Sequence, residues 1–410
     1  MTPPKPKYAA TVRYRARADG SVAHDLRYRL DGRSRSVSFD DAKHAEKWKR
    51  IFQSIGPEEA LKLLDRTFKD DSPTVNEYAE RYINGKSGVE GKTLDHYRMF
   101  MRLHIGPTLG ELPIDAVSKE MIAGWVNFQA EDGDAAKSIK NRHGFLSGMF
   151  ISATEEEPPL IGRNPCAKTN LPSSERREMV FLTANEFVSL LAYIPPHYQS
   201  LVTLLAATGL RWGEATALRP GDIDLERLTL RVARAWKSSM AKGWYIGPPK
   251  TPKSRRTIPI DQDLAELLRP LVASGSEYLF TSYRGKPIRQ ANFWSDVWAP
   301  ARRMANGQAP FELSQRNKDL KWQPRPEGVW DREPAEVPIG KVPRIHDLRH
   351  SHASWLLEGG IGIDVVQQRL GHEKITTTVD TYGHIAQARS VAAAFSIGKT
   401  LAGAMPQLLP

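Results

Sequence analysis

The chain opens on three short stretches in which polar and apolar residues alternate. They cover residues 11–18, 26–30 and 33–39, and the last follows the turn-type pair Asp31-Gly32. A period of two is typical of strands with one buried face. The polar positions of the first two stretches carry the arginines Arg13, Arg15, Arg17, Arg27 and Arg29. We therefore predict a three-stranded sheet with one arginine-lined face.

A helical pattern follows the third predicted strand. Asp40 is expected to cap a helix that runs to about Ile55 and backs the apolar face of the sheet. The arginine face then stays open, and a strand face of this kind can enter a DNA groove. The alternative is a solvated polar face that binds nothing.

Helical periodicity dominates the next hundred residues. A short connecting helix is predicted at 57–68, and a new unit opens at Ser72-Pro73 with Thr74 as a helix-start signal. Breaks that contain Gly or Pro separate four further helices, at about 74–84, 91–104, 118–130 and 135–154. This pattern predicts a small helical bundle.

Basic residues mark the last helix of this bundle. Lys137, Lys140 and Arg142 are expected on one exposed surface, next to Asn141. Such a surface can contact phosphates, and an ordinary solvated helix face explains these residues as well.

A Pro-, Ser- and Arg-containing stretch at 158–180 is predicted to link this bundle to a further domain. That domain begins near Phe181 and is mostly helical. Three strand patterns interrupt it, and we expect them to form one sheet: 228–235, 243–248 and 255–260.

Composition narrows the class of protein. The 410 residues suggest two or three domains, and 40% hydrophobic with 26% charged residues indicates a globular protein. The single cysteine, Cys166, excludes an intrachain disulfide, and the sequence offers no Cys/His zinc cluster. No apolar leader follows the N-terminus, and the best apolar run, Leu201–Leu210, is too short to span a membrane. We expect an intracellular protein.

The net charge of +11 indicates a polyanionic partner. Residues 1–55 hold thirteen Lys and Arg against six Asp and Glu, which is +7 of that total. The front end is therefore the strongest candidate for binding a polyanion.

The C-terminal half contains five short motifs in a fixed order. They are ATGLRWGE at 207–214, PPKTPKSRRTIPI at 248–260, HDLRHSHAS at 346–354, LGH at 370–372, and Tyr382. Each alone is usually structural, but together they resemble the tyrosine recombinase, or phage integrase, family. The family pattern is Arg, Lys, His-x-x-Arg, His and Tyr. The resemblance covers about 181–400 motif by motif, and the earlier units by architecture only.

This resemblance implies the fold class and the domains. We expect a multidomain, mainly α protein with small β-sheets, whose catalytic domain is mixed α+β. The implied order is an arm-type DNA-binding domain at 1–55, a linker helix at 56–71, a helical core-binding domain at 72–157, a linker at 158–180, and a catalytic domain with a tail helix at 181–401. The implied catalytic residues are Arg211, Lys250, His346, Arg349, His372 and the nucleophile Tyr382.

These residue types suit strand cleavage at a phosphodiester. Two guanidiniums, Arg211 and Arg349, can hold the extra negative charge of a pentacoordinate phosphorus. His346 lies three residues before Arg349, so both can reach one phosphate, whereas His350 falls off that line. His372 can donate to a phosphate oxygen or exchange a proton.

Tyr382 is a weak nucleophile at pH 7, since a phenol has a pKa near 10, and adjacent cations and a base must activate it. A phosphotyrosyl bond conserves the energy of the phosphodiester, so we expect neither ATP nor a metal or other cofactor. Lys250 is our candidate for protonating the leaving 5'-oxygen, and Lys253 is the rival. Glu214 is expected to orient a neighbour or to cap backbone.

The resemblance also implies partners. It implies double-stranded DNA with core-type and arm-type sites, and a homotetramer on synapsed DNA that resolves through a Holliday junction. A host DNA-bending protein and a directionality factor are further partners that it suggests, in a bacterial cytoplasm. The segment 385–401 is predicted as an amphipathic tail helix that docks on a neighbouring protomer, or else packs on its own domain.

One stretch departs from a compact domain. Residues 305–343 are polar, rich in proline and too long for an ordinary loop, so we interpret them as an insertion that lies over DNA or against another subunit.

Two other functions remain open from sequence. A type IB topoisomerase uses a similar site to relax DNA, and a noncatalytic DNA-binding protein would keep the scaffold alone. The separate front domain argues against the first, and the complete set of six residues argues against the second.

Overall fold

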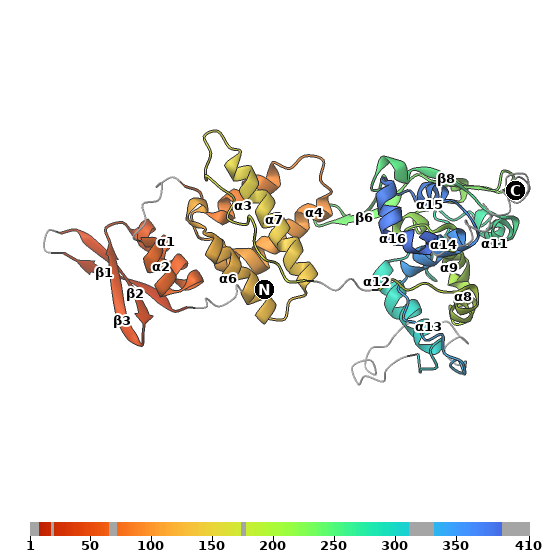
Figure 1. Ribbon diagram of the computed structural model, residues 1–410, viewed down its shortest axis with the longest axis horizontal. Coiled ribbons are helices and arrows are strands. Elements are labelled where there is room, and N and C mark those ends of the chain that lie inside the picture. Colours follow the sequence, from red (N-terminus) through yellow and green to blue (C-terminus); the bar gives the residue numbers. More distant parts are fainter. Residues whose placement is uncertain (1–7, 18–19, 65–71, 174–177, 311–331, 388–410) are drawn as a thin grey trace, which may run out of the picture. The chain divides into compact units, whose positions relative to one another are not determined.

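The computed structural model describes residues 8–17, 20–64, 72–173, 178–310 and 332–387 (Figure 1). The chain forms two compact units, residues 1–176 with 239–241 and residues 177–238 with 242–410. The boundary between them falls inside the stretch expected to be a linker. The finer division into five segments stays a prediction.

The front of the first unit is the expected three-stranded sheet with a helix on one side (Figure 1). Its strands are β1 (Ala10–Ala16), β2 (Val22–Leu30) and β3 (Arg33–Phe39), all antiparallel, and helix α1 (Ala42–Ile55) follows. The cap is one residue later than predicted, because Asp41, and not Asp40, accepts a hydrogen bond from the backbone N–H of His44 at 2.7 Å.

The strand register separates the two faces of this sheet. Arg13 lies opposite Asp25, and Arg27 lies opposite Thr11 and Ser36, so Arg13, Arg15, Arg27 and Arg29 share one face. The opposite face carries the buried side chains of Leu26 and Tyr28, and the Tyr28 ring lies 4.7 Å from that of Phe52 on α1. Burial of the apolar face against α1 leaves the arginine face exposed.

One acid modifies the charge of the arginine face. Asp25 accepts hydrogen bonds from Ser38 Oγ at 2.6 Å and from Arg15 Nε at 3.1 Å, and these bonds lower its pKa. Arg17 lies beyond the end of β1 and pairs with Asp40. The open face therefore keeps a clear excess of positive charge.

The rest of the first unit is helical, as predicted. Its elements are α2 (Pro57–Leu64), α3 (Val75–Asn84), α4 (Gly91–Phe100), the π-helical turn η1 (Met101–Ile105), α5 (Gly106–Leu109), the 3-10 turn η2 (Ile114–Ala116), α6 (Lys119–Glu131) and α7 (Ala136–Thr154). Helix α3 begins at Thr74, whose hydroxyl forms a capping box with Glu77. Tyr78, Ile105, Trp125 and Phe150 are buried in the core of the bundle.

The surface predicted on α7 is only partly present. Lys137 and Lys140 are exposed, but Arg142 is buried. Its guanidinium donates to Gln129 Oε1 at 2.8 Å and to both carboxylate oxygens of Asp134, at 2.5 and 3.2 Å. The expected exposure of Arg142 was wrong, because this buried guanidinium binds Gln129 and the half-buried Asp134 in the loop between α6 and α7.

Helices are the main secondary structure of the second unit. They are α8 (Ala184–Leu191), α9 (Pro196–Thr208), α10 (Trp212–Ala215), the 3-10 turn η3 (Pro220–Asp222), the 3-10 turn η4 (Pro252–Ser254), α11 (Gln262–Val272), α12 (Gln290–Phe293), the π-helical turn η5 (Trp294–Trp298), α13 (Ala299–Met304), α14 (Asp347–Glu358), α15 (Ile363–Leu370) and α16 (Ile375–Gln387). None of the helices in the described ranges combines the length and apolarity that crossing a bilayer requires.

The predicted single sheet of this unit is wrong. Strands β4 (Ile223–Asp224), β5 (Thr229–Val232) and β8 (Arg256–Pro259) form one sheet, whereas β6 (Ala235–Ser239) and β7 (Gly243–Gly247) form a separate hairpin. A short turn joins β6 to β7, so each finds its partner locally. The rings of Trp236 and Trp244 stack across the hairpin at 3.8 Å.

The flanks of the predicted insertion pack on their own unit. Ala335 N–H donates to Met304 O, Ile339 N–H donates to Ala305 O, and Lys341 Nζ donates to Phe181 O, at 2.8–3.0 Å. Residues 311–331 and 388–410 lie outside the described residues. The position of the insertion centre and of most of the tail helix therefore stays a prediction.

Replacing Arg142 with Ala should lower the free energy of unfolding of the first unit by about 1–3 kcal/mol, because it leaves the buried Gln129 side chain without its hydrogen-bond donor. The exposed neighbour gives the control, since Lys140→Ala should change it by less than about 0.5 kcal/mol. Denaturant titration of both variants measures the difference. Equal effects would contradict a structural role for Arg142.

Candidate active site

The expected catalytic segments start where two helices end in left-handed glycines. Helix α9 ends at Gly209 with φ 64°, and α15 ends at Gly371 with φ 66°. Arg211 follows the first glycine by two residues, and His372 directly follows the second. Glycine adopts this backbone without a Cβ clash, so both chains can turn sharply at the site.

Arg349 connects both helix ends to α14. Its side chain is buried, and Nη1 donates to Gly209 O at 2.6 Å while Nη2 donates to Leu370 O at 2.7 Å. Burial, and next the charge of Arg211, lower the pKa of Arg349 to about 9. The guanidinium is still charged at pH 7, and these bonds use two of its five N–H donors.

Arg211 is held by a buried acid. Glu214 accepts from Arg211 Nη1 at 2.9 Å, from the Arg211 backbone N–H at 3.1 Å, and from Arg256 Nη2 at 3.1 Å. Burial alone would raise the pKa of Glu214, but Arg256 and Arg211 together bring it below its ordinary value. Glu214 therefore stays ionised and fixes the direction of Arg211, which agrees with the orienting role expected from sequence.

The two histidines predicted for the site are neutral at pH 7. Burial, and next His350 and the nearby arginines, lower the pKa of His346 to about 4. Burial and the arginines lower the pKa of His372 to about 4. His372 Nδ1 lies 2.9 Å from Thr378 Oγ1, which fixes the imidazole ring against α16. A neutral imidazole can donate one hydrogen bond and accept another.

Tyr382 lies on α16 and is almost fully buried, with 1% of its surface exposed. Its hydroxyl lies 2.8 Å from His350 Nδ1. Burial raises the pKa of Tyr382 to about 12, and the charge of Arg349 acts in the opposite direction. The phenol is thus in cis within the electrostatic reach of Arg349.

The spacing argument from sequence missed His350. The signal was present, because HDLRH places His350 four residues after His346, and residues four apart share a helix face. The two imidazole rings meet edge to face, with centroids 5.1 Å apart. What sequence lacked was the position of α16, which brings Tyr382 onto His350.

The structure does not bring Lys250 to the other five residues. Lys250 is exposed, and across the described residues it has no hydrogen bond or ion pair with the rest of the set. Lys253 Nζ donates to Glu373 O at 3.1 Å, next to His372. The choice between the two lysines therefore stays a prediction.

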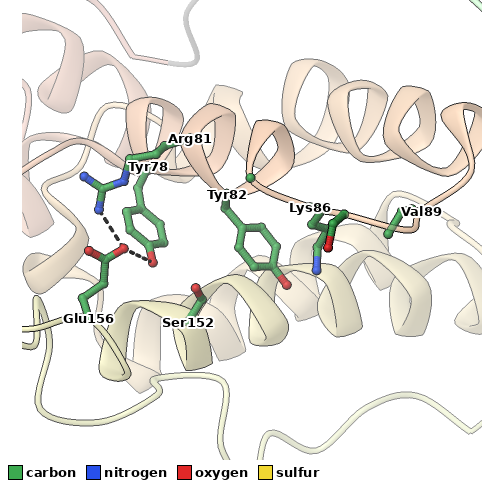
Figure 2. A pocket seen from close by; sticks show the side chains of 9 residues that line it. Tyr78, Arg81, Tyr82, Lys86, Val89, Ser152 and Glu156 are labelled. Atoms are coloured by element: carbon green, nitrogen blue, oxygen red, sulfur yellow. Dashed lines mark hydrogen bonds and ion pairs between the residues drawn. The ribbon is translucent and has the colours of Figure 1, made fainter.

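Two cavities lie in the helical bundle of the first unit. One of about 700 Å³ is drawn in Figure 2, where Glu156 accepts from Tyr78 OH at 3.0 Å and from Arg81 Nη2 at 2.9 Å. Tyr82 also lines the second cavity, of about 390 Å³, together with Lys140 and Asn141. Basic and aromatic side chains thus line concave surfaces on the bundle.

A metal site was not expected from sequence. Over the ranges that the structure describes, His, Cys, Asp and Glu side chains form no group of three that could hold an ion.

Comparison with known proteins places this arrangement in one family. The sequence profile of the phage integrase family matches residues 180–312 and 313–389. The ICEBs1 integrase of Bacillus subtilis is 27% identical over 287 residues, covering 69% of this chain and 71% of that protein. The integrase of Mycobacterium phage D29 is 26% identical over 350 residues, covering 82% of each.

Two solved structures share the fold. The Tn1549 transposon integrase in complex with a circular intermediate DNA has 22% identity and a TM-score of 0.60, covering 76% of this chain and 95% of that one. A lambda integrase tetramer bound to a Holliday junction has 21% identity and a TM-score of 0.51, covering 93% and 96%.

Replacing Gly209 with Ala should displace Arg349 and destabilise the second unit. An added Cβ would meet His352 at 2.7 Å and Leu370 at 2.8 Å, and its positive φ alone costs about 1–3 kcal/mol. Gly221→Ala is the control, because nothing lies within 4 Å of a Cβ there. A melting temperature of the Gly209 variant equal to that of the control would refute this role of the helix end.

Proposed function

This chain belongs to the phage integrase family and is a site-specific DNA recombinase, and we propose that Tyr382 is the residue that becomes joined to DNA. One observation carries the proposal. The Tyr382 hydroxyl contacts an imidazole at 2.8 Å in cis, and that imidazole adjoins Arg349, which is buried and charged. A nucleophile, a proton acceptor and an anion-binding cation thus meet within the second unit.

Strand cleavage then exchanges one ester for another. The phenolic oxygen of Tyr382 bonds to phosphorus, the bond from phosphorus to the 5'-oxygen breaks, and a 3'-phosphotyrosyl link remains. Arg211 and Arg349 bind the nonbridging oxygens, whose charge grows in the transition state, while His346 and His372 donate hydrogen bonds to them. Attack by a 5'-hydroxyl reverses the step, and no ATP is consumed because the ester energy is conserved.

The leaving 5'-oxygen needs a proton, and we assign that role to Lys250. This lysine lies on an exposed segment between β7 and β8, so it can reach DNA that binds over the site. Lys253 instead donates to the backbone beside His372. Both lysines are exposed, so it is the engagement of Lys253 with the backbone that supports Lys250 as the acid.

The front unit carries the candidate surfaces for further DNA contacts. The exposed arginine face of β1 and β2, with Arg17 at its end, fits an arm-type DNA site in a domain spanning 1–55. Lys137 and Lys140 on α7 fit a core-type site in a helical domain spanning 72–157. Residues 181–401 then make up the catalytic domain.

We infer that four protomers act together on paired DNA sites through a Holliday junction in the bacterial cytoplasm. A lambda integrase has been solved as a tetramer on such a junction, and the two chains share the fold. In this assembly the 385–401 segment docks on a neighbouring protomer. A host DNA-bending protein and a directionality factor complete the proposed set of partners.

The variant Tyr382→Phe should bind DNA like the wild type but form no covalent adduct. Sequencing the DNA ends trapped on the wild-type protein identifies the core site, which is then built into a nicked suicide duplex. Adduct formation is measured on denaturing gels, and affinity by mobility shift. An adduct formed by the Phe variant would exclude Tyr382 as the nucleophile.

A substrate with a bridging 5'-sulfur shows which of the two lysines protonates the leaving group, because a thiolate leaves without needing a proton. On the ordinary substrate, Lys250→Ala should cleave about 10²–10⁴-fold more slowly than the wild type. On the sulfur substrate this deficit should largely disappear. If Lys253→Ala is the variant that the sulfur rescues, the assignment moves to Lys253.

A further inference from the structure

We propose that His350 is the general base of the reaction, which takes the phenolic proton of Tyr382 during cleavage and returns it during rejoining. This inference rests on the proposed function, because it needs Tyr382 to be the nucleophile. It adds to the six residues of the family pattern a seventh, which directly follows Arg349 in the sequence.

The contact geometry favours His350 over the other histidines of the site. His350 Nδ1 lies 2.8 Å from the Tyr382 hydroxyl, within the range of direct proton transfer. In the described residues neither His346 nor His372 has such a bond to Tyr382, and His372 Nδ1 is already engaged by Thr378. His346 only packs its ring edge against His350.

The surroundings of His350 keep its imidazole able to accept a proton. From α14 and the segment before it, Asp347, Arg344 and Arg349 act on its charge, and burial together with the two arginines lowers its pKa. The Phe181 ring packs against it from the segment before α8, at 6.4 Å, and Tyr382 packs against it from α16. At pH 7 the ring is neutral, and with its proton on Nε2 the lone pair of Nδ1 faces the phenol.

The step balances without another reactant. As the phenolic oxygen bonds to phosphorus, its O–H bond breaks and the proton moves to Nδ1, which gives an imidazolium. The electron pair of the broken phosphorus–oxygen bond goes to the 5'-oxygen, which takes the proton of Lys250. In rejoining, the imidazolium returns its proton to Tyr382 as the phosphotyrosyl bond breaks.

The position next to Arg349 makes this transfer reversible. Burial disfavours a new positive charge on His350, Asp347 favours it, and Arg344 and Arg349 add to the effect of burial. The imidazolium is therefore tolerated while phosphate occupies the site and readily gives its proton back. Rejoining requires an imidazolium that releases its proton readily, just as cleavage requires an imidazole that accepts one.

The test combines His350→Phe with a fluorinated tyrosine at position 382, whose phenol ionises more readily and needs a base less. The rate of adduct formation is measured in single turnover on the nicked core-site duplex. We expect His350→Phe to cleave about 10²–10⁴-fold more slowly, with unchanged DNA affinity. The fluorinated tyrosine should raise the rate of adduct formation of the His350→Phe variant at least about tenfold.

The matched control is His346→Phe, which removes the imidazole one helical turn earlier. Its loss should not be relieved by the fluorinated tyrosine. His350→Gln is the second variant, to be used if the Phe variant has a lower melting temperature. Gln can hydrogen-bond the phenol but cannot take its proton. This variant should therefore cleave as slowly as His350→Phe, and the fluorinated tyrosine should raise its rate by the same factor.

Two results would overturn the proposal: a His350 variant that cleaves like the wild type, or a deficit that the fluorinated tyrosine relieves only in the His346 variant. The failure of the underlying function looks different. In that case Tyr382→Phe itself would form an adduct, whatever residue stands at position 350.

Discussion

The buried guanidinium of Arg349 is the interaction on which the catalytic unit depends. It ties the last turn of α9 and the last turn of α15 to the first turn of α14 through two backbone carbonyls. Arg211 and His372 follow directly after these helix ends. One side chain thus fixes the relative position of three sequence segments, and Arg211 and His372 in two of them are 161 residues apart. The group that connects these segments is also a cation of the proposed reaction.

This arrangement concentrates positive charge where the proposed reaction places the phosphate. Besides burial, the charges of Arg211 and Arg256 lower the pKa of Arg349, and that of Arg211 lowers the pKa of Arg256. Glu214 is the acid that Arg211 and Arg256 share. Burying cations together is unfavourable, and an anion between them relieves that cost. The neutral state of His346 and His372 has the same cause, because a further proton on either imidazole would add to the repulsion between the cations.

Sequence alone predicted the order of the chemical groups and most of the helices and strands, because capping residues, glycines and periodicity are local signals. The cap of α1 is Asp41, one residue after the aspartate that the sequence predicted. The failures concern contacts that the periodicity of a single segment does not reveal. The exposure predicted for Arg142 ignored Asp134 in the loop before α7, and the single sheet ignored the local pairing of β6 with β7. The contact of His350 with Tyr382 depends on the docking of α16, 32 residues further along the chain. Lys250 differs from these residues, because its proposed role depends on contact with DNA and not on another segment of the chain.

The burial of Tyr382 explains why this proposed nucleophile stays unreactive between reactions. With 1% of its surface exposed and a pKa raised to about 12, the phenol remains protonated and shielded from water at pH 7. The charge of Arg349 favours the phenolate, but burial affects the pKa of Tyr382 more strongly and raises it. In the proposed reaction, deprotonation therefore coincides with bond formation to phosphorus, when the negative charge passes to the oxygens assigned to Arg211 and Arg349. A nucleophile that ionises only in that way reacts with a bound phosphodiester and remains inert when the site is empty.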